Sequence, residues 1–139
     1  MKLKSLTYTS LARLDLTADD LDSIHQAAMH FNALDGITGL LIFNGTHFLQ
    51  VIEGAEEAID DLTARLRRDP RHHGLEIRDQ PMVEKRSFPD WSMELVRVKA
   101  RYYEAKDAVE QVLPQGLSNE TWSLILTMTE RISTTVELD

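Results

Sequence analysis

The polar side chains best suited to chemistry in this sequence stand inside otherwise apolar segments. Tyr8 and Ser10 are two residues apart in a run of aromatic and β-branched residues, so a strand there places both side chains on one face. Gln50 lies within the apolar segment Phe48–Ile52, and Asn32 lies near the end of an amphipathic segment. A buried amide needs partners, so Gln50 either completes an internal hydrogen-bond network or meets a polar ligand. Gln50 alone favours the internal network, because most buried amides are satisfied within the protein.

Taken together, these polar residues and the apolar side chains of two predicted helices suit a flat heteroaromatic ligand with a polar edge. The ring would lie between the helices, and its edge would meet Asn32 and Gln50. The side chains around the ring would be Ile24, Phe31 and Leu66, with Arg65 and Asp69 at the end of the second helix. Trp91 and Met93 are expected to share one face of the last strand.

The histidines do not predict a metal site. His25 and His30 are five residues apart on a predicted helix, and the adjacent His72 and His73 point apart in most backbones. Metal ligands must instead converge on one point. We therefore interpret these four residues as surface histidines, and no metal is predicted.

Enzyme motifs are absent from the sequence. The acidic pairs Glu56-Glu57 and Asp60-Asp61 are typical of a solvated helix face rather than of a catalytic acid–base pair. There is no glycine-rich phosphate loop, nucleophile elbow or HExxH motif. The absence of cysteine also excludes disulfides and thiol catalysis. We predict that the protein is not an enzyme.

Length and composition bound the remaining function classes. The 139 residues, 42% hydrophobic and 27% charged, predict one soluble globular domain with a real core. A net charge of −8 argues against nucleic-acid or anionic-membrane partners, which need positive surface. No apolar run approaches the ~18 residues that span a bilayer. The N-terminal segment lacks the apolar core of a signal peptide, so a cytoplasmic location is expected.

The elements that must position Gln50 are two strands joined by a tight turn. Ile37–Phe43 is almost entirely apolar, which indicates a central strand buried on both faces, and His47–Ile52 predicts its partner. Asn44 and Gly45 between them predict a hairpin with a type I′ turn, because both residues tolerate positive φ.

Amphipathic helices are predicted before and after this hairpin. Thr17 is the predicted N-cap of the first helix, which runs to about Leu34, and Asp20 would complete its capping box. The second helix begins at Glu56 and is ended by Pro70. Their apolar stripes are Leu21, Ile24, Ala28 and Phe31 in the first helix and Ile59, Leu62 and Leu66 in the second.

Further strands are predicted at Leu3–Ser10, Leu75–Val83 and Trp91–Val98. The resulting order, β-α-β-β-α-β-β, favours a ferredoxin-like α+β sandwich with both helices on one face of an antiparallel or mixed sheet. Residues 1–98 are predicted to form this domain.

Residues 99–139 are predicted to be a C-terminal helical hairpin that packs on the open face of the sheet. Its helices are expected at Tyr102–Val112 and Asn119–Ser133. The last helix has more apolar coverage than one stripe requires, through Trp122, Leu124, Ile125, Leu126 and Met128. An apolar surface left after packing marks an interface, so we predict a homodimer or higher homo-oligomer.

Several segments carry a resemblance to a known family. They are Tyr8-Thr9-Ser10, Asn32 with Gly36-Ile37-Thr38-Gly39, FLQVIEG from Phe48 to Gly54, Asp69-Pro70-Arg71-His72, and RSFPDWSM from Arg86 to Met93. In order and spacing the sequence resembles the BLUF domain, the flavin-binding blue-light sensor, over residues 1 to about 98. Its length resembles the short BLUF proteins in which a helical tail follows the sensor.

The resemblance implies a noncovalently bound FAD, with FMN or riboflavin as alternatives, between the two helices. It implies that Asn32 hydrogen-bonds the ring edge and that Gln50 lies between the ring and Tyr8. Tyr8 would donate an electron and then a proton to the excited flavin, and Gln50 would rotate or tautomerise, which leaves a red-shifted flavin. Trp91 and Met93 would relay the change to an unknown downstream partner. The other cofactor-binding positions implied are Ser10, Ile24, Phe31, Phe48, Arg65, Leu66, Asp69 and His72.

Other readings of the same α+β framework remain open. Phe31 stands where relatives often carry Asn or His, so one polar ring contact would become simple stacking. Ala28 stands where relatives often carry Ser, which removes another possible hydrogen bond. An RNA-recognition or protein-interaction module without a chromophore shares the framework, but RNA recognition needs aromatic platforms on basic strands. A small ferredoxin-like hydrolase would need an anion-binding loop, which the sequence does not contain.

Overall fold

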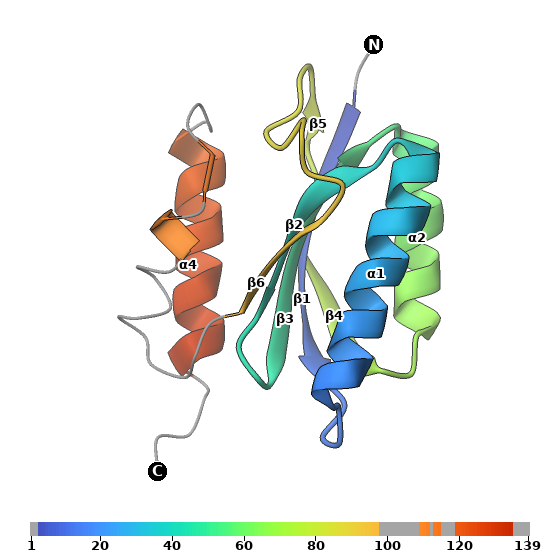
Figure 1. Cartoon of the computed structure of the whole chain (residues 1–139). Helices are drawn as coiled ribbons and strands as arrows, with labels where there is room; N and C mark the ends of the chain where they lie inside the picture. The colour runs from blue at the N-terminus through green and yellow to red at the C-terminus, as the bar shows by residue number, and fades with distance from the viewer. Residues whose placement is uncertain (1–2, 98–108, 112, 115–118, 135–139) are drawn as a thin grey trace.

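A computed structural model describes residues 3–97, 109–111, 113–114 and 119–134 of the chain. The helices and strands within these ranges are β1 (Leu3–Ala12), α1 (Ala18–Asp35), β2 (Thr38–Phe43), β3 (His47–Gly54), α2 (Glu56–Arg68), β4 (His72–Asp79), β5 (Met82–Val83), β6 (Glu94–Arg97) and α4 (Asn119–Thr134). One mixed sheet separates α1 and α2 on one face from α4 on the other (Figure 1). The predicted fold class, a ferredoxin-like α+β sandwich, is confirmed.

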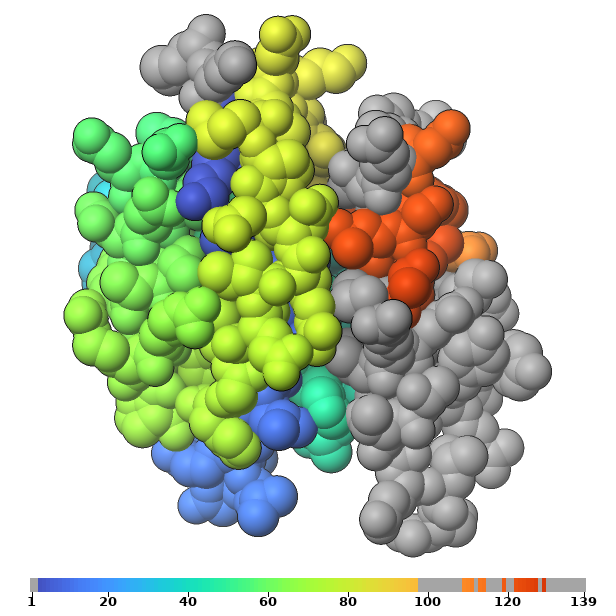
Figure 2. All heavy atoms as spheres, turned by 180° about the vertical axis from the view of Figure 1, so that it is seen from behind, coloured from blue at the N-terminus to red at the C-terminus, as the bar shows by residue number. Residues whose placement is uncertain are grey.

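The sheet has the strand order β4-β1-β3-β2-β6, with β5 also paired to β1. All of these pairs are antiparallel except β2 with β6, which is parallel. The central strands β1 and β3 therefore bring Tyr8 opposite Gln50 in the register of the sheet. At the edge, β4 lies between α2 and α4 on the surface seen from behind (Figure 2).

Two predicted strands begin three residues away from their observed starts, whereas the bounds of the others differ by one or two residues. The single strand predicted at Leu75–Val83 is instead β4, which already begins at His72, and the short β5. Pro81 separates them because it has no N–H to donate to the ladder, although its carbonyl accepts a hydrogen bond from Ser5 N at 2.9 Å. The last strand begins at Glu94 rather than Trp91.

The predicted hairpin at the centre of the sheet is confirmed, but its two turn residues are Gly45 and Thr46 rather than Asn44 and Gly45, because Asn44 N donates to the His47 carbonyl at 3.3 Å. Strands β2 and β3 pair from Thr38 opposite Glu53 to Phe43 opposite Phe48. In the turn, Gly45 has φ of 98°, and Asn44 Oδ1 accepts hydrogen bonds from the backbone N–H groups of the two residues that follow Gly45. The Asn side chain therefore replaces a backbone carbonyl in closing the turn.

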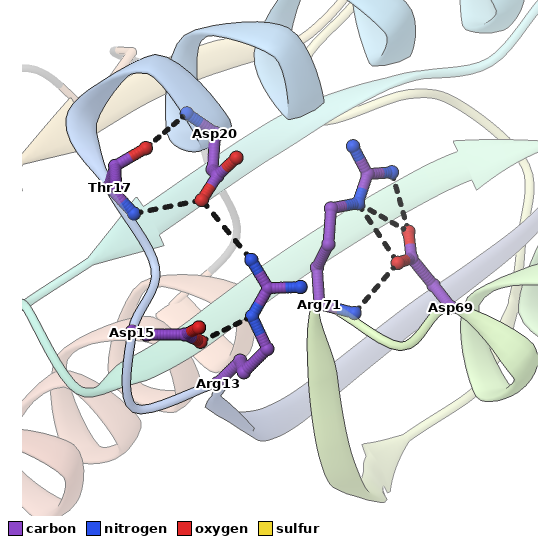
Figure 3. Close-up of polar contacts among 6 residues, drawn as sticks. All are labelled: Arg13, Asp15, Thr17, Asp20, Asp69 and Arg71. Carbon is purple, nitrogen blue, oxygen red and sulfur yellow. Dashed lines mark hydrogen bonds and ion pairs between the residues drawn. The ribbon is translucent and has the colours of Figure 1, made fainter.

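Helix α1 begins and ends as its local sequence predicts. Asp20 N donates to Thr17 Oγ1 at 3.1 Å, and Thr17 N donates to Asp20 Oδ2 at 3.0 Å, which completes the capping box (Figure 3). Gly36 follows the helix in the left-handed conformation, with φ of 69°. Helix α2 buries Ile59 and Leu62 and ends at Arg68, two residues before Pro70.

The alternation of side chains along β3 divides the core into two clusters. Phe48, Gln50 and Ile52 face α1 and α2, whereas Leu49 and Val51 face α4. The helix-side cluster also contains Tyr8, Leu21, Leu41, Ile59, Leu62 and Met93. The cluster on the α4 side also contains Leu40, Ile42, Phe88, Val96, Ile125 and Leu126.

The predicted final helix is observed as α4. Ile125 and Leu126 are buried against the sheet, and Trp122 and Leu124 are partly buried beside them. Of the predicted helix Tyr102–Val112, only residues 109–111 are described, and these are helical. The division of the chain at residue 98 stays a prediction. Within the described ranges, no helix is both long and apolar enough to cross a membrane.

Candidate functional site

A cavity of about 240 Å³ lies between α1, α2 and the helix-side face of the sheet. Its lining includes all the predicted cofactor-binding residues except Ser10: Tyr8, Ile24, Phe31, Asn32, Phe48, Gln50, Arg65, Leu66, Asp69 and His72. The lining residues that were not predicted as cofactor-binding are Ala27, Ala28, Leu41, Leu62 and Arg71. Of these, Arg71 belongs to the DPRH motif, and the others are apolar residues in the predicted stripes, the adjoining turn or the central strand. The cavity thus combines apolar walls with a few convergent polar groups.

A hydrogen-bonded chain of three side chains runs along the sheet side of the cavity. The Tyr8 hydroxyl donates to Gln50 Oε1, and Gln50 Nε2 donates to Met93 Sδ at 3.3 Å. All three residues are buried, with exposures of 2–4%. Burial, and to a lesser degree the negative charge of Asp69, raises the pKa of Tyr8 well above its ordinary value. Tyr8 is therefore a neutral donor at physiological pH.

Asn32 supplies an unsatisfied hydrogen-bond donor in the same cavity. It lies in the last turn of α1 and is 2% exposed. Its backbone carbonyl accepts a hydrogen bond from Ile37 N at 2.7 Å, but Asn32 Nδ2 has no hydrogen-bond partner in the described part of the chain. A buried amide donor without a partner costs about 1–3 kcal/mol, so Asn32 Nδ2 is suited to donate to an acceptor in the cavity.

His72 is buried, so its interpretation as a surface histidine is wrong. Its Nε2 donates to the Leu66 carbonyl at 2.5 Å, and its Nδ1 lies 2.8 Å from Ser10 Oγ. Because a carbonyl can only accept, Nε2 carries the proton, and in the neutral ring Nδ1 accepts from the serine hydroxyl. The contact with Ser10 joins residues 62 positions apart, which is why sequence spacing could not reveal it. Ser10 therefore lies behind His72 rather than at the cavity wall.

His25 is also tied to the structure rather than free at the surface. Its Nε2 donates to the Met93 carbonyl at 2.8 Å. This bond links α1 to the residue that contacts Gln50. No group of three or more His, Cys, Asp or Glu side chains suited to a metal ion occurs among the residues described.

A charged pair lies at one end of the cavity, where α2 meets β4. Arg71 contacts both carboxylate oxygens of Asp69, with Nη2 2.6 Å from Oδ2 and Nε 2.9 Å from Oδ1 (Figure 3). The Arg71 side chain lowers the pKa of Asp69, which stays ionised. Arg65 is paired with Asp35 at 3.5 Å across the helices.

The apolar wall contains side chains that are incompletely covered by protein. Phe31 is 51% exposed even though it lines the cavity, while Ile24 and Leu66 are partly buried. Phe48 is buried on the sheet side. A flat ring between α1 and α2 would cover these side chains on both of its faces.

Trp91 and Met93 lie on opposite faces of the sheet, so the prediction that they share one face is wrong. Met93 belongs to the helix-side cluster, whereas Trp91 packs on the α4 side and stacks on Phe88 at 5.4 Å between ring centroids. The strand period does not apply because both residues precede β6. Instead, Gly39 N donates to the Trp91 carbonyl at 2.9 Å, and the chain crosses the edge of the sheet at this point.

Comparisons with known proteins identify the family of this chain. The chain matches the BLUF family, described as "Sensors of blue-light using FAD", over residues 3–94. The blue light- and temperature-regulated antirepressor BluF of Escherichia coli (strain K12) is 31% identical over 116 residues. That match covers 84% of this chain but 28% of the antirepressor.

Solved structures show the same similarity. The dark-state structure of BlrB, a BLUF protein, is 35% identical with a TM-score of 0.73, and the match covers 96% of this chain and 97% of that one. The structure of Klebsiella pneumoniae BlrP1 with FMN and cyclic diGMP is 28% identical with a TM-score of 0.78. That match covers 91% of this chain and 34% of that one. The chain described here belongs to the BLUF family of flavin-binding blue-light sensors.

Proposed function

We propose that this chain binds FAD in the cavity between α1 and α2 and senses blue light through the Tyr8–Gln50 pair. The observation that carries the proposal is the Tyr8–Gln50–Met93 hydrogen-bond chain in the same cavity as the unpaired Asn32 donor. The residues present suit a flavin, because Asn32 Nδ2 would donate to a ring carbonyl and Ile24 and Leu66 would pack on the two ring faces. We assign the chain a sensory rather than a catalytic role.

A bound flavin excited by blue light would supply the acceptor for an electron. Tyr8 would be the residue that gives up that electron, and its hydroxyl proton would move toward Gln50 Oε1, the atom that it already contacts. Both would return to Tyr8, so that no residue is oxidised overall. Gln50 is left in its second arrangement, because rotation or tautomerisation exchanges the positions of its donor and acceptor groups. A buried amide with two such arrangements is a small bistable element that light can bias.

The choice of FAD rests on the family and on the charged end of the cavity. Arg65 and the Asp69–Arg71 pair are close to where a ribityl and phosphate chain would leave the ring site, and the arginines suit its negative charge. FMN would use the same ring contacts with a shorter tail. Chromatography of the flavin released on denaturation distinguishes the two, and release intact also tests noncovalent binding.

The deciding experiment is the absorption spectrum of the purified full chain, before and after blue light. We expect an oxidised flavin whose absorption shifts to the red and returns in the dark. The Tyr8→Phe and Gln50→Leu variants should each keep the flavin and lose the shift, at a stability cost of about 1–3 kcal/mol. Thr63→Val is the matched control, because it removes a buried hydroxyl that bonds a carbonyl of α2 outside the cavity lining. A protein that stays colourless with added FAD contradicts the proposal, and a normal shift in either variant contradicts the Tyr8–Gln50 mechanism.

We propose further that the signal leaves through the α4 side of the sheet to a partner protein. Trp91 and α4 share the cluster on that side, which supports this direction. The partly buried Trp122 and Leu124 on α4 support association with a like subunit there. The Escherichia coli relative is described as an antirepressor, and for this chain we propose only that its output is a protein contact.

A further inference from the structure

Two residues of the family-like motifs, Glu53 and Arg86, have no role in the photoresponse described above. Glu53 follows Gln50 by three residues on β3, is 1% exposed, and lies opposite Thr38 of β2. Arg86 begins the irregular segment that leads to Trp91 and Met93. Both residues make hydrogen bonds that attach this segment to the rest of the fold.

The Glu53 carboxylate accepts hydrogen bonds from two backbone N–H groups of that segment, and the Ser87 side chain and the Arg86 charge also stabilise it. Its Oε2 accepts from Ser87 N at 2.8 Å, and its Oε1 accepts from Phe88 N at 2.8 Å. Burial raises the pKa of Glu53, and the two N–H donors oppose that rise. A glutamine of the same shape has one acceptor oxygen, and its NH₂ group would face the second N–H. The site therefore requires a carboxylate, not only a side chain of this size.

Arg86 fixes the start of the segment to the ends of neighbouring elements. Its Nη1 donates to Thr38 Oγ1 at 2.9 Å and to the Glu53 carbonyl at 2.9 Å. Its Nη2 donates to the Gly36 carbonyl at 2.6 Å, directly after α1. One guanidinium thus connects the segment to α1, β2 and β3.

The contacts that follow along the chain carry this attachment to Met93. Phe88 is 1% exposed, its carbonyl accepts from Trp91 N at 3.3 Å, and its ring stacks on that of Trp91. Gly39 holds the Trp91 carbonyl, and His25 holds the Met93 carbonyl. The segment makes no ladder pairing between residues 86 and 93, so these contacts determine where the Met93 side chain lies.

We propose that Glu53 and Arg86 are positioning residues for the photoresponse, which hold residues 86–93 so that Met93 Sδ stays within reach of the Gln50 amide while Trp91 remains on the α4 side. The inference rests on the proposed function, because its readout is the flavin signal. Met93 Sδ is the acceptor for Gln50 Nε2 in the observed arrangement. Displacing it changes the relative free energies of the two Gln50 arrangements and hence the rate of return in the dark.

The test compares the flavin-loaded full chain with its Glu53→Gln variant. Glu84→Gln is the matched control, because it makes the same change at an exposed residue near the same segment. We expect Glu53→Gln to change the dark-recovery rate by about threefold or more, and the control to change it by less than about 1.5-fold. Backbone amide exchange at Ser87 and Phe88 should become at least about tenfold faster in Glu53→Gln alone.

A second substitution separates positioning from a purely structural role. In a Met93→Leu background, Glu53→Gln should change the recovery rate by less than about 1.5-fold, because the sulfur acceptor through which it acts is gone. An effect of the same size in both backgrounds overturns the proposal, as does an unchanged recovery rate in Glu53→Gln. If Glu53→Gln does not fold, Arg86→Met replaces it. The same changes in dark-recovery rate are then expected, with Met93 present and in the Met93→Leu background.

The outcomes also distinguish this inference from the proposed function. If the parent chain shows no light-induced shift, the proposed function fails, and the photoresponse role of Glu53 and Arg86 fails with it. If the parent shifts normally and Glu53→Gln recovers at the parent rate, the proposed function stands and only the positioning role is overturned.

Discussion

The chemistry of the site depends on a tyrosine that keeps its proton. Tyr8 is buried in the helix-side cluster, donates to Gln50 Oε1, and has an elevated pKa because an ionised phenolate would be desolvated beside the negative Asp69. A phenol that stays neutral can give up an electron and a proton together. The same burial makes the free energy of unfolding depend on pH in the alkaline range.

We expect stability to fall as the pH rises above about 10, the ordinary pKa of tyrosine. In that range Tyr8 ionises in the unfolded chain but keeps its proton in the folded protein, so the folded state binds more protons and loses stability with rising pH. The Tyr8→Phe variant should lack this part of the slope. Unfolding free energies of both proteins from pH 8 to pH 11 are the measurement, and parallel curves would contradict the prediction.

Asn32 yields a prediction in which stability and affinity change in opposite directions. Replacing Asn32 by Leu removes a buried donor that has no partner in the described structure, so the flavin-free protein should gain up to about 1–3 kcal/mol. Flavin affinity should fall by about tenfold or more, because the donor to the ring edge is lost. Denaturant unfolding without flavin and a fluorescence titration with flavin measure the two effects. An unchanged affinity would remove Asn32 from the binding site.

At the scale of elements, Gly39 of β2 lies too close to the backbone of β3 to carry a side chain. A Cβ added to Gly39 would lie 1.9 Å from the Val51 carbonyl oxygen, so only glycine fits there. The Gly39 N–H on the other side holds the Trp91 carbonyl. The glycine of the Ile37-Thr38-Gly39 motif is therefore required by the close packing of β2 on β3.

Gly39→Ala is expected to destabilise the protein by about 3 kcal/mol or more, because neither backbone can move away without breaking ladder hydrogen bonds. Gly36→Ala is the comparison: nothing lies within 4 Å of its added Cβ, and its left-handed φ of 69° should cost only about 1 kcal/mol. Chemical denaturation of both variants tests the order, and equal losses would mean that strain rather than the Val51 contact dominates.

Local signals predicted the elements better than they predicted the connections between them. The Thr17 capping box and the Asn44-Gly45 hairpin are set by residues within a few positions of each other, so the sequence alone identified both. The position of His72 depends in part on Ser10, 62 residues away, and the position of Met93 depends in part on His25, 68 residues away. No period or spacing in the chain encodes such contacts. Most of the anticipated cavity lining followed from residue types and spacing, whereas Phe48 and His72 were anticipated through the family resemblance.

At the scale of the whole molecule, the sheet separates the cavity from α4. Gln50 points to the helix side, and the buried face formed by Leu49 and Val51 lies between the cavity and α4. Residues 88–93 contribute to both clusters because they pass around the β2 edge. A change at Gln50 therefore has a short path to the α4 side, through its hydrogen bond to Met93 Sδ and then along the chain to Trp91, without rearrangement of the central strands.

The last prediction concerns association through α4. Its described exposed positions, Asn119, Ser123 and Thr127, lie on one line, and the half-buried Trp122 and Leu124 flank that line. A like subunit that covers both apolar side chains would place Ser123 inside the interface. We expect light scattering at tens of micromolar to give twice the mass of one chain, and Ser123→Arg to restore the monomer by adding bulk and charge without disturbing the core.

Ser23→Arg on α1 is the matched control, since it makes the same change at an exposed position on the opposite side of the sheet and should leave the dimer intact. A monomeric parent, in the dark and under blue light alike, would contradict association altogether. A dimer that survives Ser123→Arg would instead place the interface away from α4. Because the sheet lies between α1 and α4, an arginine at position 23 does not reach the α4 surface, and an arginine at position 123 does not reach the α1 surface.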